Sequence, residues 1–225
     1  MEKTKKIKLF IGLFYSIFII LFLYYFFSKF SPQEIMSYEF IKNNRDYISE
    51  LKQTNMIILA LIFILFTIVW VFAAGFGSPI AIFAGFIFGQ WAGAIIAVIG
   101  LSIGSTLLYI FANFFLKELI REKFLSKFQN LEVKFKKSEF IYLLIYRFIG
   151  GIPFAIANVL PCIFNVKPTN FFWASIIGML PPLFIICSIG SGLEKIIDEN
   201  LSAPSFIDLI TSKNIFIPLI TFIIF

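Results

Sequence analysis

Residues 56–116 form a stretch of 61 residues without any aspartate, glutamate, lysine or arginine. About 18 consecutive apolar residues already suggest a transmembrane helix, so this stretch is long enough to cross a bilayer and return. The composition agrees, because 60% of the residues are hydrophobic and 14% are charged, against roughly half and a quarter in soluble domains. We therefore expect an integral membrane protein of the all-α class.

A second apolar run, residues 9–27, follows a basic N-terminus. This run is longer than the core of a signal peptide, has no small-residue cleavage site, and ends in aromatic residues typical of a membrane interface. We expect a retained transmembrane helix. Ser31 and Glu34 then have the spacing of a helix-capping box, which predicts an amphipathic surface helix. Residues 1–55 would form this N-terminal unit.

Glycine and proline interrupt the long apolar stretch at residues 74–79, after a clear span that begins at Met56. The segment that follows, residues 80–89, is too short to cross alone. Non-helical backbone survives at membrane depth only where protein or water surrounds it. We therefore expect a re-entrant hairpin over residues 78–95, followed by a span over residues 96–116.

The second half of the chain has the same plan. Residues 117–139 carry seven basic and four acidic residues, and their apolar residues recur at helical spacing, which predicts another amphipathic helix. Residues 140–165 form two short apolar segments around Gly-Gly-Ile-Pro at 150–153, which predicts a second re-entrant hairpin. A span over residues 171–189 follows, with a kink or break at Pro181-Pro182. Interrupted segments in corresponding positions of two halves point to a transport pathway between them.

The last part of the chain, residues 194–225, begins as a polar loop. Its final apolar segment, residues 214–225, has only twelve residues, which is too short for a transmembrane helix. We expect an unfinished span, and therefore a sequence that is truncated within it.

The net charge of +6 arises mainly at the N-terminus and in residues 117–137. Both segments flank apolar runs, where lysine and arginine commonly face anionic headgroups, so we expect a membrane surface and not nucleic acid as the partner. If both segments lie inside, residues 56–116 must cross three times, which would abolish the first re-entrant hairpin. We keep the hairpin, and the orientation stays open.

The sequence offers little for an enzyme. It has no histidine, and it lacks a metal-ligand set, a Gly-x-Ser-x-Gly elbow and a phosphate-binding loop. Its two cysteines, Cys162 and Cys187, stand alone in apolar surroundings, which is typical of small buried residues. We expect no enzyme, no metal and no cofactor.

An ordered set of residues resembles a known family. In the second half it comprises Tyr146-Arg147-Phe148-Ile149-Gly150-Gly151-Ile152-Pro153-Phe154, Asn158, Phe171, Gly178 and Pro181. In the first half it comprises Gly85-Phe86-Ile87-Phe88-Gly89, Gly93, Gly100, Gly104 and Tyr109. Over residues 75–192 the set resembles the VTT domain of the DedA and SNARE-associated Golgi protein superfamily, most closely its Golgi-type branch, which also occurs in bacteria.

This resemblance implies a helical bundle with two opposed re-entrant hairpins and amphipathic interfacial helices, in a membrane domain over residues 56–193. The better-understood members of the family move lipids or polyprenyl phosphates between leaflets. Two positions depart from the family pattern, because Asn113 stands where a basic residue is common and Cys162 where a glycine is common. The acidic residues tied to proton coupling in the DedA branch are also missing from residues 56–116, so proton coupling is not implied here.

Arg147 is the first candidate for a substrate-binding residue. A charged side chain inside an apolar hairpin costs about 2.5 kcal/mol or more and is a functional candidate by default, and its planar guanidinium suits a lipid phosphate. The alternative is a snorkelling arginine near the interface, because Arg147 follows Glu139 by only eight residues. Gly150, Gly151 and Pro153 would shape a turn that admits a headgroup, or merely a tight turn.

Three further candidates are weaker. Asn158 could bind a headgroup, although such residues more often join helices by hydrogen bonds. Tyr109 and Asn113 could form a partner pair, or simply pack. We expect partners among membrane lipids with anionic or phosphate-bearing headgroups, and a homo-oligomer stays open.

Two functions remain in competition. The first is a lipid scramblase or transporter of the cell membrane without proton coupling. The second is a non-transporting structural or assembly factor of the cell envelope, which predicts a tight protein partner and indifference to Arg147.

Overall fold

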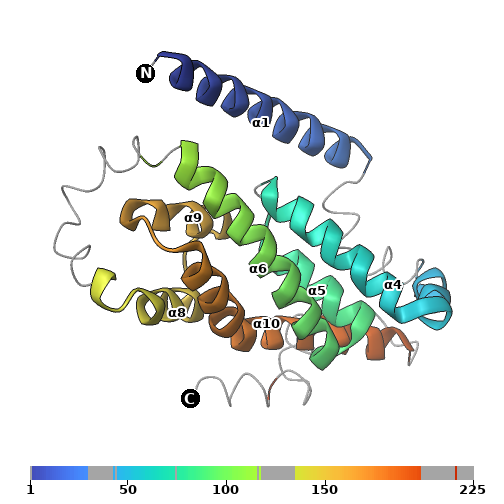
Figure 1. Cartoon of the computed structure of the whole chain (residues 1–225). Helices are drawn as coiled ribbons and strands as arrows, with labels where there is room; N and C mark the ends of the chain where they lie inside the picture. Colours follow the sequence, from blue (N-terminus) through green and yellow to red (C-terminus); the bar gives the residue numbers. More distant parts are fainter. Residues whose placement is uncertain are drawn as a thin grey trace.

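The computed structural model describes residues 2–29, 43, 45–73, 75–115, 117, 135–198 and 216. The regular elements in this part of the chain are all helices, which confirms the all-α class. In chain order they are α1 (Glu2–Lys29), α4 (Arg45–Phe72), α5 (Gly77–Phe88), α6 (Gln90–Phe115), α8 (Glu139–Ile149), α9 (Phe154–Val159), the 3-10 helix η1 (Leu160–Phe164) and α10 (Pro168–Asp198) (Figure 1).

Within the described residues, three helical segments are long and apolar enough to cross a membrane, namely Asn55–Phe72, Gln90–Phe115 and Pro168–Glu194. They belong to α4, α6 and α10. The apolar part of α1, Phe10–Phe26, is shorter, and α1 lies along one side of the bundle that the other helices form (Figure 1).

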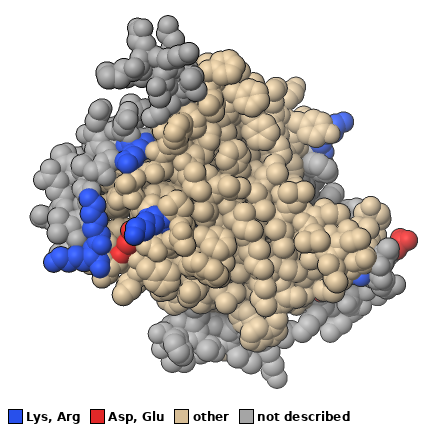
Figure 2. Space-filling model, in the orientation of Figure 1, with Lys and Arg blue, Asp and Glu red and all other residues tan. Residues whose placement is uncertain are grey.

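The distribution of charged side chains on the surface also fits a membrane protein. Figure 2 shows a broad uncharged face, with lysine, arginine and acidic side chains at its left and right edges. A membrane protein has this distribution because charged side chains are costly in hydrocarbon and favourable at the two interfaces.

The bundle contains an inverted repeat. In the first unit, α4 and α5 form a hairpin, Gly89 turns the chain with φ 78°, and the long helix α6 follows. In the second unit, α8 and the α9–η1 segment form a hairpin, Asn165 turns the chain with φ 51°, and the long helix α10 follows. We call these hairpins the α4–α5 hairpin and the α8–α9 hairpin.

The two units are oriented in opposite directions. Near the end of α6, Tyr109 stacks on Phe171, which lies near the start of α10. Near the start of α6, Gln90 donates a hydrogen bond to Ser188, which lies late in α10. The long helices α6 and α10 are therefore antiparallel, and each carries its own hairpin.

The helices that follow the two turns, α5 and α9, approach each other at their first residues. Phe154, the first residue of α9, lies 3.3 Å from the position that a Cβ on Gly77 would occupy, and Gly77 is the first residue of α5. The pattern matches the opposed hairpins that the family resemblance implies. Their re-entry into a membrane stays a prediction.

The bounds of the first hairpin differ from those expected. The predicted hairpin over residues 78–95 and the predicted span over residues 96–116 are not separate, because α6 runs unbroken from Gln90 to Phe115. Its glycines at positions 93, 100 and 104 are helical and allow close packing. The turn that corresponds to Gly150–Pro153 instead precedes Gly77, and α5 has 12 residues, or about 18 Å, too short to cross.

Two other expectations, a span that begins at Met56 and a kink or break at Pro181-Pro182, can be compared with the structure. Asn55 interrupts α4 with an extended backbone, φ −163°, and its side chain accepts a hydrogen bond from the Ile58 amide at 3.1 Å, as a helix N-cap does. Pro181 and Pro182 lie inside α10, so the chain continues as one helix beyond residue 189. Most of the surface helix predicted to begin at Ser31, most of the one predicted over residues 117–139 and most of the C-terminal segment 194–225 lie outside the described residues.

Glycines allow the closest helix contacts. A Cβ at Gly178 of α10 would lie 2.8 Å from the Leu144 carbonyl oxygen of α8. A Cβ at Gly190 of α10 would lie 2.0 Å from the Ile82 carbonyl oxygen of α5. Helix α10 therefore touches the backbone of one hairpin with its first half and of the other with its second half, as small residues permit in membrane bundles.

Candidate functional site

Arg147 lies near the end of α8 and is buried, with 6% of its surface exposed. Its Nε donates a hydrogen bond to Ser175 Oγ on α10 at 3.0 Å, and its Nη2 donates one to Asn158 Oδ1 on α9 at 2.8 Å. The guanidinium carbon also lies 4.6 Å from the centre of the Phe171 ring, a cation–π distance. The arginine therefore joins α8, α9 and α10, and it does not snorkel to a surface.

All the partners of this cation are neutral. Glu194 pairs with Lys52, and among the described residues no carboxylate forms a contact with Arg147. Only two of the five guanidinium N–H groups have an acceptor in this part of the chain. A buried charge without an opposite charge is costly, so the site favours an anion.

Asn158 supplies a second unused donor. The residue is fully buried, its Oδ1 accepts the bond from Arg147, and its Nδ2 has no hydrogen-bond partner in the described structure. A buried unpaired amide costs about 1–3 kcal/mol. Arg147 and Asn158 thus place spare N–H groups side by side, which is the donor pattern that a phosphate oxygen accepts.

Tyr109 reaches the same site through an aromatic stack. Its ring lies parallel to Phe171 with 4.6 Å between centroids, so the order is Tyr109, Phe171, Arg147. Its hydroxyl donates a hydrogen bond to the Val166 carbonyl oxygen at 2.6 Å. Tyr109 therefore fixes Phe171, which in turn faces the guanidinium.

Asn113 lies at a different place, where α6 ends. Its Nδ2 donates to Asn165 Oδ1 at 3.2 Å, and Lys117 Nζ donates to the same oxygen at 2.8 Å. Tyr109 and Asn113 are therefore not a hydrogen-bonded pair. Both tie α6 to the turn between η1 and α10.

Gly150, Gly151 and Pro153 lie in an exposed turn after α8. The two glycines have positive φ values of 67° and 81°, which side chains rarely adopt. The turn directs the chain back into α9 and so brings Asn158 to Arg147. The three residues themselves are not among the contacts of the guanidinium.

Gly150→Ala should lower the stability of the protein by about 1–3 kcal/mol, because φ 67° strains any L-residue. A Cβ there would meet no atom within 4 Å, so strain and not a clash is the cause. The midpoint of thermal unfolding in detergent measures the effect. Ile152→Ala in the same turn is the control, and an equal midpoint for both variants would contradict the prediction.

The sequence did not single out Ser175. Phe171, Ser175 and Gly178 are spaced by four and three residues, so they form one face of α10, and this face lies against α8. The sequence contains this spacing, but a single serine in an apolar helix does not indicate a site unless the residue that it contacts is known.

An apolar cleft in the described structure lies away from Arg147. It has a volume of about 530 Å³ between α1, α4 and α6, and residues such as Phe18, Phe72 and Phe111 line it. None of the residues around Arg147 lines it, and Arg147 and Asn158 are themselves buried.

The comparison with protein families decides what kind of membrane protein this is. The model of the VTT domain matches residues 76–192, more than half of the chain. The chain belongs to the VTT-domain family. The match includes the three turns that carry a positive φ, at Gly89, Gly150-Gly151 and Asn165, as well as the Gly77–Phe154 contact and every residue of the Arg147 site.

Two curated relatives extend this result. The VTT chain is 30% identical to the uncharacterized protein YqeD of Bacillus subtilis over 118 residues. This alignment covers 52% of the chain and 57% of YqeD. It is 24% identical over 136 residues to the transmembrane protein 41 homolog of Caenorhabditis elegans, covering 57% and 55%. The chain thus spans little more than half the length of these relatives. No solved structure matches it.

Proposed function

We propose that this VTT-domain protein moves lipids or lipid-linked phosphates between the leaflets of the cell membrane, as a multi-pass protein. The single observation that carries the proposal is the Arg147 site. A buried cation with neutral protein partners and spare donors requires an anion for full compensation, and a phosphate-bearing headgroup supplies one.

The arrangement of the hairpins supports the same proposal. Transport sites in membrane proteins occur at the interface between inverted repeats, where broken helices meet. Here Arg147 lies in the α8–α9 hairpin, a few residues before the turn that meets the α4–α5 hairpin. The family resemblance, whose better-understood members move lipids or polyprenyl phosphates, agrees with this site.

Purified protein in liposomes should exchange fluorescent lipids between leaflets faster than empty liposomes do. Lipids with anionic phosphate headgroups should exchange fastest, because they can compensate Arg147. The assay uses several headgroups and follows the loss of fluorescence to an external quencher. Exchange at the rate of empty liposomes with every headgroup would refute the proposed function.

The burial of Arg147 among residues of three helices favours a second candidate. A non-transporting structural factor of the envelope would use Arg147 only to join α8 to α9 and α10, which its three contacts do. Crosslinking and co-purification distinguish the two functions, because this candidate requires a defined protein partner at fixed stoichiometry.

A further inference from the structure

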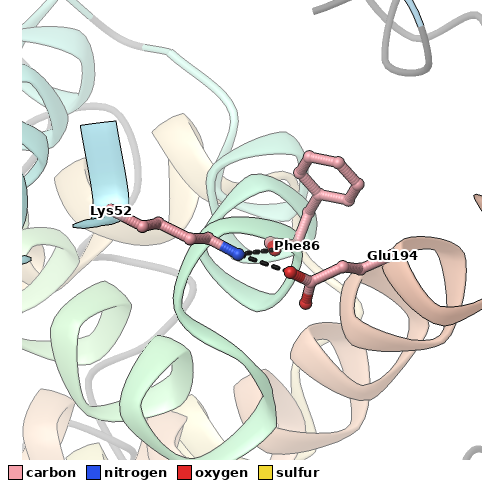
Figure 3. Close-up of polar contacts among 3 residues, drawn as sticks. All are labelled: Lys52, Phe86 and Glu194. Atoms are coloured by element: carbon pink, nitrogen blue, oxygen red, sulfur yellow. Dashed lines mark hydrogen bonds and ion pairs between the residues drawn. The ribbon is translucent and has the colours of Figure 1, made fainter. Parts of the chain in front are cut away.

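Lys52 of α4 makes polar contacts with two other helices, α5 and α10. Its Nζ forms a salt bridge with Glu194 Oε1 near the end of α10, and it donates a hydrogen bond to the Phe86 carbonyl oxygen of α5 at 3.4 Å. Figure 3 shows the ammonium group between these two acceptors. The contact lies at the base of the α4–α5 hairpin and attaches that hairpin to α10.

The chemistry of a helix end explains why a lysine lies there. The last four carbonyl groups of α5 have no partner within the helix, and they carry the negative end of its dipole. Lys52 satisfies one of these carbonyls, and Glu194 balances its charge. The pair bridges 142 residues of sequence, from the first unit of the repeat to the second.

The opposite end of the bundle has a corresponding polar contact. There Lys117, after α6, donates to Asn165 in the turn between η1 and α10. Glu139, the first residue of α8, accepts a hydrogen bond from the Lys167 amide. Each hairpin is thus attached at its base to polar groups near an end of a long helix.

Helix α10 has a weak point between its two sets of contacts. Pro181 and Pro182 have no backbone N–H, so two hydrogen bonds of the helix are missing at its middle. The part before them carries Gly178 and Ser175, which contact α8. The part after them carries Cys187, Gly190 and Glu194, which contact the α4–α5 hairpin.

We propose that the Lys52–Glu194 pair is a latch, and that its release lets the part of α10 after Pro181-Pro182 swing away from the α4–α5 hairpin. The pair is suited to release, because its side chains are 25% and 29% exposed and such pairs are weak. Under it the backbones of α5 and α10 meet at Gly190, and Leu183 and Cys187 of α10 share an apolar cluster with α5, so the motion must separate this packing. The use of this opening for lipid passage rests on the proposed function, whereas the opening itself does not.

The two native cysteines report on this motion. Cys187 lies on the moving part of α10, is fully buried, and its Sγ donates to the Ala81 carbonyl oxygen of α5 at 3.1 Å. Cys162 lies in η1, is equally buried, and its Sγ lies 3.9 Å from the Tyr109 carbonyl oxygen of α6. Release of the latch should expose Cys187 and leave Cys162 covered.

The test measures the rate at which N-ethylmaleimide modifies each cysteine in the full chain, in detergent, by mass spectrometry. Lys52→Ala and Glu194→Ala should each speed the modification of Cys187 about fivefold, as expected for the loss of a partly exposed ion pair, with Cys162 unchanged. The exchange of charges in Lys52→Glu with Glu194→Lys should slow the modification relative to the single variants but not reach the wild-type rate, because a carboxylate at position 52 cannot donate to the Phe86 carbonyl. Lys117→Ala, at the other end, should leave Cys187 unchanged.

Three results with the variants at positions 52 and 194 would overturn the latch. They are an unchanged Cys187 rate in both single variants, an equal acceleration of Cys162 in them, and a charge-exchange variant whose Cys187 reacts as fast as in the single variants. Acceleration of Cys187 by Lys117→Ala would mean general loosening and would also overturn it. Because the assay needs no lipid transport, a protein that exchanges no lipid can still have the latch.

Discussion

Arg147→Ala should abolish lipid exchange while the protein still accumulates in the membrane. The substitution removes the only buried cation of the described structure, and with it the charge that attracts a phosphate. We expect the exchange rate of anionic lipids to fall at least about tenfold, since a hydrogen bond to a charged group contributes about 1.5–3 kcal/mol. The measurement is the liposome assay at equal protein abundance.

Arg147→Lys separates recognition from charge alone. Lysine keeps the charge but loses the planar fork that binds two oxygens at once. It also cannot donate to Ser175 and Asn158 in the geometry of the guanidinium. We therefore expect an exchange rate between those of the wild type and the alanine variant.

Lys137→Ala is the matched control, because Lys137 is an exposed cation just before α8, and its loss should leave the rate unchanged. Equal activity of wild type, lysine and alanine variants at equal abundance would remove Arg147 from the mechanism. Failure of the alanine variant to accumulate would show a structural role, which is what the second candidate function requires.

The class of the protein and the α8–α9 hairpin could be predicted from the sequence. Long uncharged runs leave few alternatives to membrane helices, and Gly150-Gly151-Ile152-Pro153 combines two positive φ values with a proline that ends the turn. Neither feature depends on the rest of the fold.

The bounds of the first hairpin were harder to predict, because glycine has two roles in a membrane helix. Gly89 turns the chain with a positive φ, whereas Gly93, Gly100 and Gly104 stay helical and let α6 approach α5 and α4. The sequence shows a glycine in both cases and does not distinguish the two roles. Only the position of the neighbouring helix distinguishes a break from a close contact.

The surroundings of Arg147 could not be predicted either. Ser175 follows it by 28 residues, and Tyr109 belongs to the other unit of the repeat. The inversion of the repeat places α6 and α10 antiparallel, and this brings Tyr109 against Phe171. A pattern along one segment carries no information about such a pairing.

Gly190→Ala should destabilise the protein through a clash between α10 and the backbone of α5. Two effects oppose each other, because alanine favours a helix by about 1 kcal/mol over glycine. A Cβ at Gly190, however, would lie 2.0 Å from the Ile82 carbonyl oxygen and 2.8 Å from the Phe86 amide nitrogen. Both atoms are backbone, so a rotamer change cannot relieve the clash, and α10 must move away from α5.

We expect a net loss of about 1–3 kcal/mol, the usual cost of overpacking, seen as a lower thermal midpoint in detergent. Gly12→Ala in α1 is the control, because a Cβ there meets nothing within 4 Å and helix propensity should act alone. The two variants should therefore shift the midpoint in opposite directions. If Gly190→Ala were as stable as Gly12→Ala, the backbones of α5 and α10 could not be as close as they are here. The contact that the Lys52–Glu194 latch holds closed would then have to be looser.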